Sequence, residues 1–203
     1  MASCEHYLKE LLRTIEPTRA QKDGASRSQT FLRNILDSGN MSRVIVDDYL
    51  SGSYPRETAI RPLEDVDIIF VVDPGHWPRD EFTLLASDYP DPEAVLKTFI
   101  NAIRRRYDGS PLRLQSKSVR LQLYHLNIDV VPAIDRGRGD HTIMIQDRRS
   151  GKWILTAPRR HTELATDINR LRDGLFKPLV KLLKFWNSGL PSTADFRSFA
   201  VET

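Results

Sequence analysis

The feature that most constrains this chain is the run DVDIIFVVD, residues 65–73, where two aspartates lead into the longest uninterrupted apolar stretch of the sequence. Ile68–Val72 is rich in β-branched and aromatic residues, which predicts a buried strand. Asp65 and Asp67 are two positions apart, so an extended backbone places both carboxylates on one face. Because buried carboxylates are unfavourable unless they are neutralised, this strand predicts a cation at its start.

The order of the other elements indicates the fold class. Helices, strands, a helix, more strands and helices follow one another, which is not the regular alternation of a doubly wound fold. We therefore expect an α+β protein, a mixed sheet flanked by helices. Periodicity and turn residues predict helices at residues 8–15 and 18–38, strands at 43–50 and 66–73, a helix from Pro92, two strands within 112–134, a hairpin over 141–157 and two closing helices.

A third carboxylate follows in the segment LNIDVVPAI. Ile128 and Val130 share one face of the predicted strand, so Asp129 points to the other face. If this strand neighbours the first one, Asp65, Asp67 and Asp129 can converge on one cation or a close pair. Carboxylate oxygens suit Mg²⁺, which keeps several waters and is usually completed by substrate phosphates.

Gly52 and Ser53 come shortly before the paired aspartates. Glycine lets the backbone approach a ligand closely, and Ser53-Tyr54-Pro55 has the pattern of a helix start, with a hydroxyl cap followed by proline. Backbone N–H groups at a helix start favour a phosphate. The sequence thus predicts a triphosphate cradle at Gly52-Ser53, beside the carboxylates that hold the magnesium.

These motifs resemble a known family in their order and spacing. Gly52-Ser53, the Asp65-Val66-Asp67-Ile68 strand and Asp129 are similar to the signature of the nucleotidyltransferase superfamily, with its polymerase-beta-like core. The longer segment GSYPRETAIRPLEDVDIIFVV resembles the bacterial relatives of cyclic GMP-AMP synthase and oligoadenylate synthase. The likeness extends over nearly the whole chain, through SVRLQL, GKWILTAPRRHTELATDIN and PLVKLLKFWN.

The resemblance implies an enzyme that joins NTPs into a cyclic or linear oligonucleotide second messenger, with release of pyrophosphate, in bacterial anti-phage signalling. It implies that Asp65, Asp67 and Asp129 hold Mg²⁺, for which Mn²⁺ can substitute, and that Ser53 contacts the β- and γ-phosphates. NTPs would be the substrates, and a regulatory protein or a nucleic-acid activator a further partner. Two alternatives stay open: transfer of a nucleotide to an RNA, protein or small-molecule acceptor, and a module that binds NTP or RNA through its arginine clusters without turnover.

The last helical pattern carries a lysine stripe, and the family places a triphosphate-binding lysine on this helix. Lys184 is the first candidate and Lys181 the second. Opposite the lysines, a leucine-rich stripe predicts the buried side of the helix. Its members are Leu175, Leu179, Leu182, Leu183 and Trp186.

The family also implies a division of the chain. We expect a catalytic core at residues 1–172 and, at 173–203, the start of a helical C-terminal half that appears truncated. The sequence shows no secretory signal and no apolar run long enough to cross a bilayer. With a single cysteine, Cys4, no internal disulfide can form. We therefore expect a cytoplasmic protein, and its oligomeric state is left open.

Overall fold

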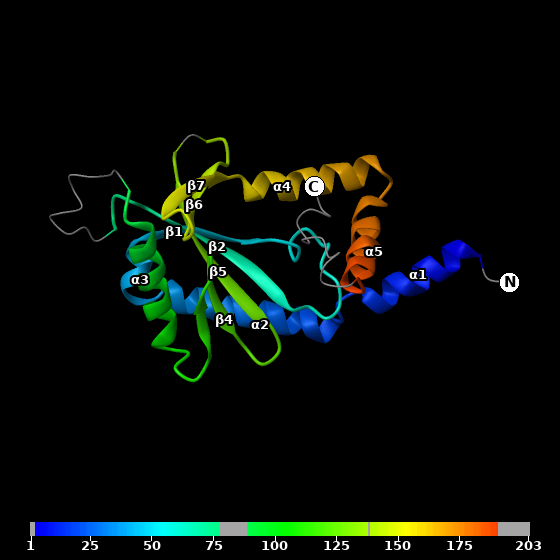
Figure 1. Cartoon of the computed structure of the whole chain (residues 1–203), viewed down its shortest axis with the longest axis horizontal. Coiled ribbons are helices and arrows are strands. Elements are labelled where there is room, and N and C mark those ends of the chain that lie inside the picture. The colour runs from blue at the N-terminus through cyan, green and yellow to red at the C-terminus, as the bar shows by residue number, and fades with distance from the viewer. Residues whose placement is uncertain (1–2, 78–88, 138, 191–203) are drawn as a thin grey trace.

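A mixed sheet of seven strands organises the computed structural model, which describes residues 3–77, 89–137 and 139–190 (Figure 1). The path through the sheet is β1-β2-β5-β4-β3, with β6 beside β5 and β7 beside β6. Only β2 and β5 pair in parallel among these strands. The strands are β1 Ile45–Ser51, β2 Asp65–Val72, β3 Leu112–Leu114, β4 Val119–Gln122, β5 Asn127–Asp135, β6 Ile143–Asp147 and β7 Lys152–Thr156.

Helices flank this sheet, which confirms the predicted α+β class. Their starts follow from local sequence: Thr18 forms a capping box with Gln21, and Asp91 caps the helix that has Pro92 in its first turn. None of the helices within the described ranges is long and apolar enough to span a membrane. The helices are α1 Cys4–Ile15, α2 Arg19–Leu36, α3 Pro92–Arg104, α4 Pro158–Leu171 and α5 Phe176–Ser188, with a short 3-10 helix, η1, at Gly39–Arg43.

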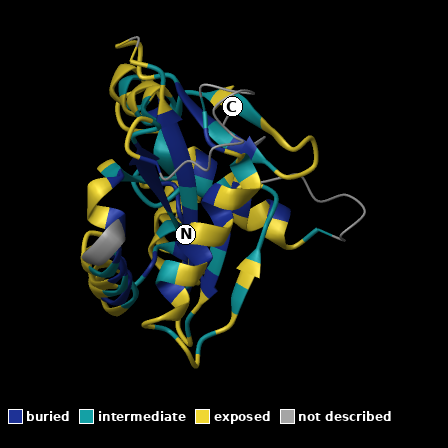
Figure 2. Cartoon of the chain, turned by 90° about the vertical axis from the view of Figure 1, so that its left-hand side faces the viewer, coloured by how far each residue is buried: buried dark blue, intermediate teal, exposed yellow. Residues whose placement is uncertain are grey.

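The two faces of the sheet carry unequal cores, because side chains alternate along each strand. Val66, Ile68 and Phe70 of β2 lie on the face that packs against α2 and α3, where the larger apolar cluster forms. Ile69 and Val71 lie on the other face, in a smaller cluster. Figure 2 shows the buried central strands between more exposed helices. Along β2, Asp65 and Asp67 point to the same side as Ile69. They therefore lie on the face that α2 and α3 leave uncovered.

The face of helix α5 that packs against the rest of the protein is the opposite of the predicted one. Four members of the leucine-rich stripe are exposed, and Leu182 is only partly buried. Lysines take the inward positions instead: Lys184 is buried, and the side chains of Lys177 and Lys181 are 15% and 13% exposed. The inward lysines meet carboxylates and carbonyls of other segments, so the polar stripe is the one that packs. Figure 1 shows α5 beside α1, at the end of the molecule away from α3. The exposed members are Leu175, Leu179, Leu183 and Trp186.

Residues 112–134 differ from the sequence-based prediction, whereas the expected division at residue 172 stays a prediction. Residues 112–134 contain three strands and not two, because the short β3 pairs with β4 before the chain turns into β5. The expected division at residue 172 falls in the connection between α4 and α5, where Asp173 and Gly174 both have positive φ. Residues 191–203 of the expected C-terminal part lie outside the described residues.

Candidate active site

The sheet register brings the aspartates together. Asp67 of β2 is directly opposite Asp129 of β5 in the parallel pair, and Asp65 precedes Asp67 on the same face. Asp129 is 5% exposed, whereas the Asp65 side chain is 49% exposed. The structure therefore places the three predicted carboxylates at neighbouring positions on the less covered face, with Asp129 deepest.

Burial and crowding raise the pKa values of Asp65 and Asp67. Burial, followed by the negative charges of Asp129 and Asp65, raises the pKa of Asp67 to about 7. Burial, followed by the charge of Asp129, also raises the pKa of Asp65, and Arg120 acts in the opposite direction. Carboxylates shifted in this way gain most from a nearby cation. The donor set, all carboxylate oxygen, fits a hard divalent ion.

The turn after β1 lies directly against this cluster. Ser51 pairs with Asp67, and Gly52 follows with φ +75°. A Cβ at position 52 would be 2.0 Å from Oδ2 of Asp67, so no other residue fits there without displacing the carboxylate. This close approach is the physical reason for the glycine.

The predicted helix start at Ser53-Tyr54-Pro55 is wrong. Residues 52–57 form turns, and no helix lies between β1 and β2, a segment that the structure describes in full. The Thr58 N–H donates to the Ser53 carbonyl, and the Glu57 N–H donates to the Tyr54 carbonyl. Serine and proline favour turns as well as helix starts, which explains the error. A phosphate bound at this turn would contact backbone N–H groups of the turn, without the added effect of a helix dipole.

Two cavities adjoin the carboxylates and share Gly52, Arg56 and Asp67 in their walls. The first, about 440 Å³, is also lined by Ser53, Asp65 and Lys184. The second, about 470 Å³, lies on the other side of Asp67. Each volume is within the usual range for small-molecule sites. The second cavity is also lined by Gln115, Ser118, Asp129, Thr156, Pro158 and His161.

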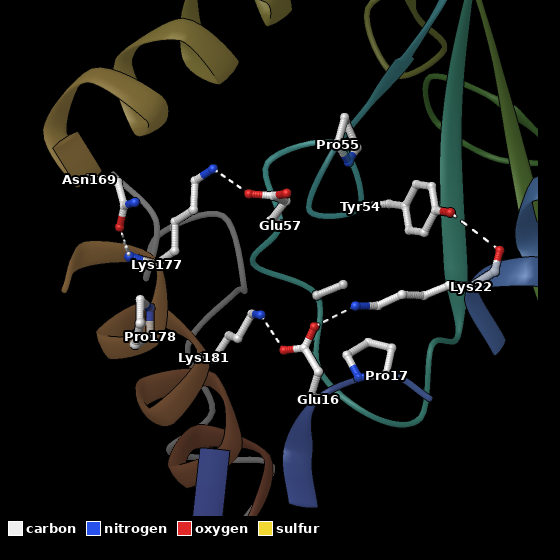
Figure 3. Close-up of a pocket in the computed structure, with 11 residues that line it drawn as sticks. Glu16, Pro17, Lys22, Tyr54, Pro55, Glu57, Asn169, Lys177, Pro178 and Lys181 are labelled. Carbon is white, nitrogen blue, oxygen red and sulfur yellow. Dashed lines mark hydrogen bonds and ion pairs between the residues drawn. The ribbon is translucent and has the colours of Figure 1, made fainter. Parts of the chain in front are cut away.

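The structure separates the two candidate lysines. Lys184 is 7% exposed, and its Nζ donates to the Thr58 carbonyl at 3.2 Å, in the wall of the first cavity. Lys181 lines a different cavity and pairs with Glu16, which Lys22 also contacts (Figure 3). Geometry therefore favours Lys184 for contact with a ligand beside Ser53.

Figure 3 shows the separate cavity, about 580 Å³, in which Lys181 lies. Lys177 of α5 pairs there with Glu57, at 2.7 Å. Glu16 follows α1, and Glu57 belongs to the turn that carries Ser53. The ion pairs thus tie α5 to the end of α1 and to the turn, which fixes the helix that positions Lys184.

Arg120 is part of the cluster, although no role was predicted for it from the sequence. It lies opposite Asp129 in the antiparallel β4–β5 pair. Its Nε donates to Oδ1 of Asp129 at 2.9 Å and its terminal nitrogen to Oδ2 at 2.5 Å. The same terminal nitrogen is 3.6 Å from Oδ2 of Asp65. In the described part of the chain, no three His, Cys, Asp or Glu side chains form a ready-made metal cluster.

A family model for the Second Messenger Oligonucleotide or Dinucleotide Synthetase domain, abbreviated SMODS, matches residues 1–169. The chain belongs to the SMODS family. The resemblance seen in its motifs is therefore confirmed at the level of the family.

Relatives of this SMODS chain are known in several bacteria. A cyclic AMP-AMP-AMP synthase from Acinetobacter sp. is 35% identical over 195 residues, which cover 92% of this chain and 52% of the relative. A probable cyclic nucleotide synthase from Bacillus cereus is 27% identical over 161 residues, covering 68% of this chain and 48% of the relative. The chain spans about half the length of these curated relatives.

Solved structures share the fold. The CdnE cyclic dinucleotide synthase of Elizabethkingia meningoseptica, determined with GTP and Apcpp, has a TM-score of 0.75 at 21% identity, over 99% of this chain and 74% of that chain. The CdnC:HORMA-deltaN complex of E. coli MS115-1 has a TM-score of 0.71 at 20% identity, over 97% and 62%. The expected α+β fold, a mixed sheet flanked by helices, is thus shared with these nucleotidyltransferase structures.

Sequence reasoning missed two arginines of the SMODS site, Arg56 and Arg120. Arg56 follows the Ser53 turn, is 8% exposed and lines both cavities. Arg120 alternates with the buried Val119 and Leu121, and this period-two pattern could have placed it on the carboxylate face. Its pairing with Asp129 depends on strand register, which the pattern alone does not give.

Proposed function

We propose that this SMODS chain is the catalytic part of a nucleotidyltransferase that joins NTPs into a cyclic or linear oligonucleotide second messenger and releases pyrophosphate. The observation that carries this proposal is the position of Asp67. It faces Asp129 across the parallel strand pair and borders two separate cavities. A reaction between two nucleotides requires this arrangement, with a donor on one side of the carboxylates and an acceptor on the other.

The first cavity suits the donor NTP. Ser53 and the turn N–H groups would contact the β- and γ-phosphates, and Lys184 would supply a positive charge from the opposite wall. Gly52 leaves the space that the Asp67 carboxylate occupies. Asp65, Asp67 and Asp129 would hold Mg²⁺, or Mn²⁺ in its place. When bound, the ion lowers the pKa of the attacking hydroxyl and neutralises charge on the phosphoryl oxygens.

The second cavity suits the acceptor nucleotide. Its position beside Asp129 directs a ribose hydroxyl toward the α-phosphate of the donor. The hydroxyl oxygen forms a bond to that phosphorus as the bond to the bridging α–β oxygen breaks. The proton leaves to solvent, and the electron pair leaves with pyrophosphate. The chain's own residues bind and align the two nucleotides, which is most of what phosphoryl transfer requires.

The biological setting follows from the same proposal. NTP substrates place the enzyme in the cytoplasm, and the synthase relatives support a role in anti-phage signalling. The CdnC relative was solved with a HORMA protein, which supports a regulatory protein as a further partner of this chain.

Product analysis tests the proposal. We would incubate the chain with mixed labelled NTPs and Mg²⁺ or Mn²⁺, treat with phosphatase and identify resistant products by mass spectrometry. We expect a phosphatase-resistant oligonucleotide that Asp67→Asn abolishes and Asp108→Asn, an exposed position, preserves. Label found only on added RNA or protein would favour a different acceptor. Mg²⁺-dependent NTP binding without any product would contradict synthase activity for this chain.

A further inference from the structure

Arg120 contacts two of the three carboxylates that the proposed function assigns to divalent cations. Both oxygens of Asp129 accept bonds from its guanidinium, at 2.9 Å and 2.5 Å. The Ser118 hydroxyl also contacts Oδ1, at 3.4 Å. The guanidinium reaches toward Asp65 as well, at 3.6 Å. One side chain therefore bridges two of the three carboxylates from the edge of β4.

This geometry opposes cation binding through Asp129. Each carboxylate oxygen has two lone pairs, and the two-pronged guanidinium contact uses one on each oxygen, in the planar geometry that arginine and carboxylate prefer. A divalent ion and the guanidinium would also repel each other at this separation.

Arg120 is able to withdraw from Asp129. Its side chain is 28% exposed, so the guanidinium can exchange a carboxylate for water without entering an apolar interior. Asp129, at 5% exposure, would lose its counter-charge in the same step, and a cation that takes the place of the guanidinium offsets that loss. Departure of the arginine and arrival of a metal ion are therefore coupled by the burial of Asp129.

We propose that Arg120 is a positioning residue that stands in for the catalytic cation. In the metal-free chain it holds Asp129 and lies near Asp65, and it leaves Asp129 when a divalent ion binds. This inference rests on the proposed metal-dependent function. Arg120 keeps the carboxylates assembled before the metal arrives and lowers the affinity of the empty site for metal. The competing interpretation is a permanent strut, in which Arg120 keeps both bonds in every state.

Metal binding without turnover separates the two interpretations. We would measure Mn²⁺ affinity by calorimetry for the wild type, Arg120→Gln and Arg120→Lys, with Asp67→Asn as the control that loses a ligand. We expect Arg120→Gln to bind Mn²⁺ about tenfold more tightly, since a charge-assisted two-pronged contact no longer competes. Arg120→Lys keeps the positive charge but cannot make the two-pronged contact. We therefore expect a smaller gain in Mn²⁺ affinity, about threefold. If Arg120→Lys binds Mn²⁺ as the wild type does, only net charge matters and the stand-in is refuted.

A spectroscopic readout in the wild type does not depend on the folding of any variant. The Nε–H resonance of Arg120, assigned in ¹⁵N-arginine-labelled chain with Arg120→Lys, reports the bond to Asp129 directly. We expect it to shift on addition of Mg²⁺ with α,β-methylene-ATP, and an unchanged resonance at saturation would establish the permanent strut. If the wild type and Arg120→Gln bind neither ion, with or without the nucleotide, the metal-dependent function fails and this inference fails with it. Equal, measurable affinities in wild type and both variants would refute the Arg120 inference alone.

Discussion

Gly52 lies against the carboxylate of Asp67, so that a Cβ on the glycine would be 2.0 Å from Oδ2. The turn that carries Ser53 and the strand that carries Asp67 are therefore in contact at the one position where a side chain cannot be added. The wall of the proposed donor cavity and the proposed metal ligands are therefore in direct contact, which Gly52→Ala would disturb.

Gly52→Ala should damage the site as well as the fold. Alanine at φ +75° costs about 1–2 kcal/mol from backbone strain alone. The matched control is Gly174→Ala, with φ +78° and nothing within 4 Å of the added Cβ. We expect both variants to lose stability in urea denaturation, but only Gly52→Ala to lose Mn²⁺ affinity. Equal Mn²⁺ affinity in the two variants would show that the contact with Asp67 has no functional role.

The raised pKa of Asp67 predicts a pH-dependent stability in metal-free buffer. The carboxyl of the unfolded chain loses its proton near its ordinary pKa of 3.8, whereas the folded one keeps its proton up to a pKa of about 7. Between these values the folded state binds more protons, so the free energy of unfolding falls as pH rises. Asp67→Asn does not titrate, so between about pH 4 and about pH 8 its free energy of unfolding should rise relative to wild type by up to about 4 kcal/mol, at about 1.4 kcal/mol per pKa unit.

The measurement is urea denaturation in EDTA from about pH 4 to about pH 8, a range set by the two protonation states. Asp108→Asn, at an exposed position, should follow the wild-type curve. A constant difference between Asp67→Asn and wild type across this range would mean that the Asp67 carboxyl is not perturbed.

Lys184 and Lys181 should differ in nucleotide binding. Lys184→Met removes a buried charge from the donor cavity, so we expect the affinity for Mg²⁺ and α,β-methylene-ATP to fall about tenfold. Lys181→Met breaks a pair with Glu16 in another cavity and should leave this affinity within about twofold. Calorimetry on both variants decides between the two lysines, and the reverse order would assign the role to Lys181.

Glu57 combines a strained backbone with an ion pair, and two substitutions distinguish the effects of these features on stability. Its φ is +58°, and its carboxylate pairs with Lys177 at 2.7 Å. Glu57→Ala loses the pair and keeps the strain, whereas Glu57→Gly loses both. We therefore expect the glycine variant to be more stable than the alanine variant by about 1 kcal/mol in urea denaturation. An alanine variant as stable as the glycine variant would contradict the strain.

Local periodicity in the sequence was enough to predict much of the fold. All five apolar positions predicted on α3 are buried, because their helical spacing can satisfy only one face: Val95, Leu96, Phe99, Ile100 and Ile103. Alternation likewise placed Asp129 away from Ile128 and Val130. The convergence of the carboxylates was predicted on the condition that the two strands are neighbours, and the structure meets that condition.

Features that depend on distant partners were not predictable in the same way. The pattern of α5 shows two unlike faces, but it does not tell which face packs, because Glu16 and Glu57 come from segments far away in the sequence. Arg120 needed the β4–β5 register before its guanidinium could be placed. The turn after Gly52 was mistaken for a helix because serine and proline serve both.

The parallel pairing of β2 with β5 runs unbroken from Asp65–Asn127 to Val72–Ile134. Deleting a single residue from β5 ahead of Asp129 would therefore turn that carboxylate into the apolar layer beneath α2 and α3 and bring a valine or isoleucine up in its place. Point substitutions can erode such a centre by degrees, but a change in strand length would remove it in one step. In this sheet, the length of a strand is therefore less free to vary than its amino-acid composition.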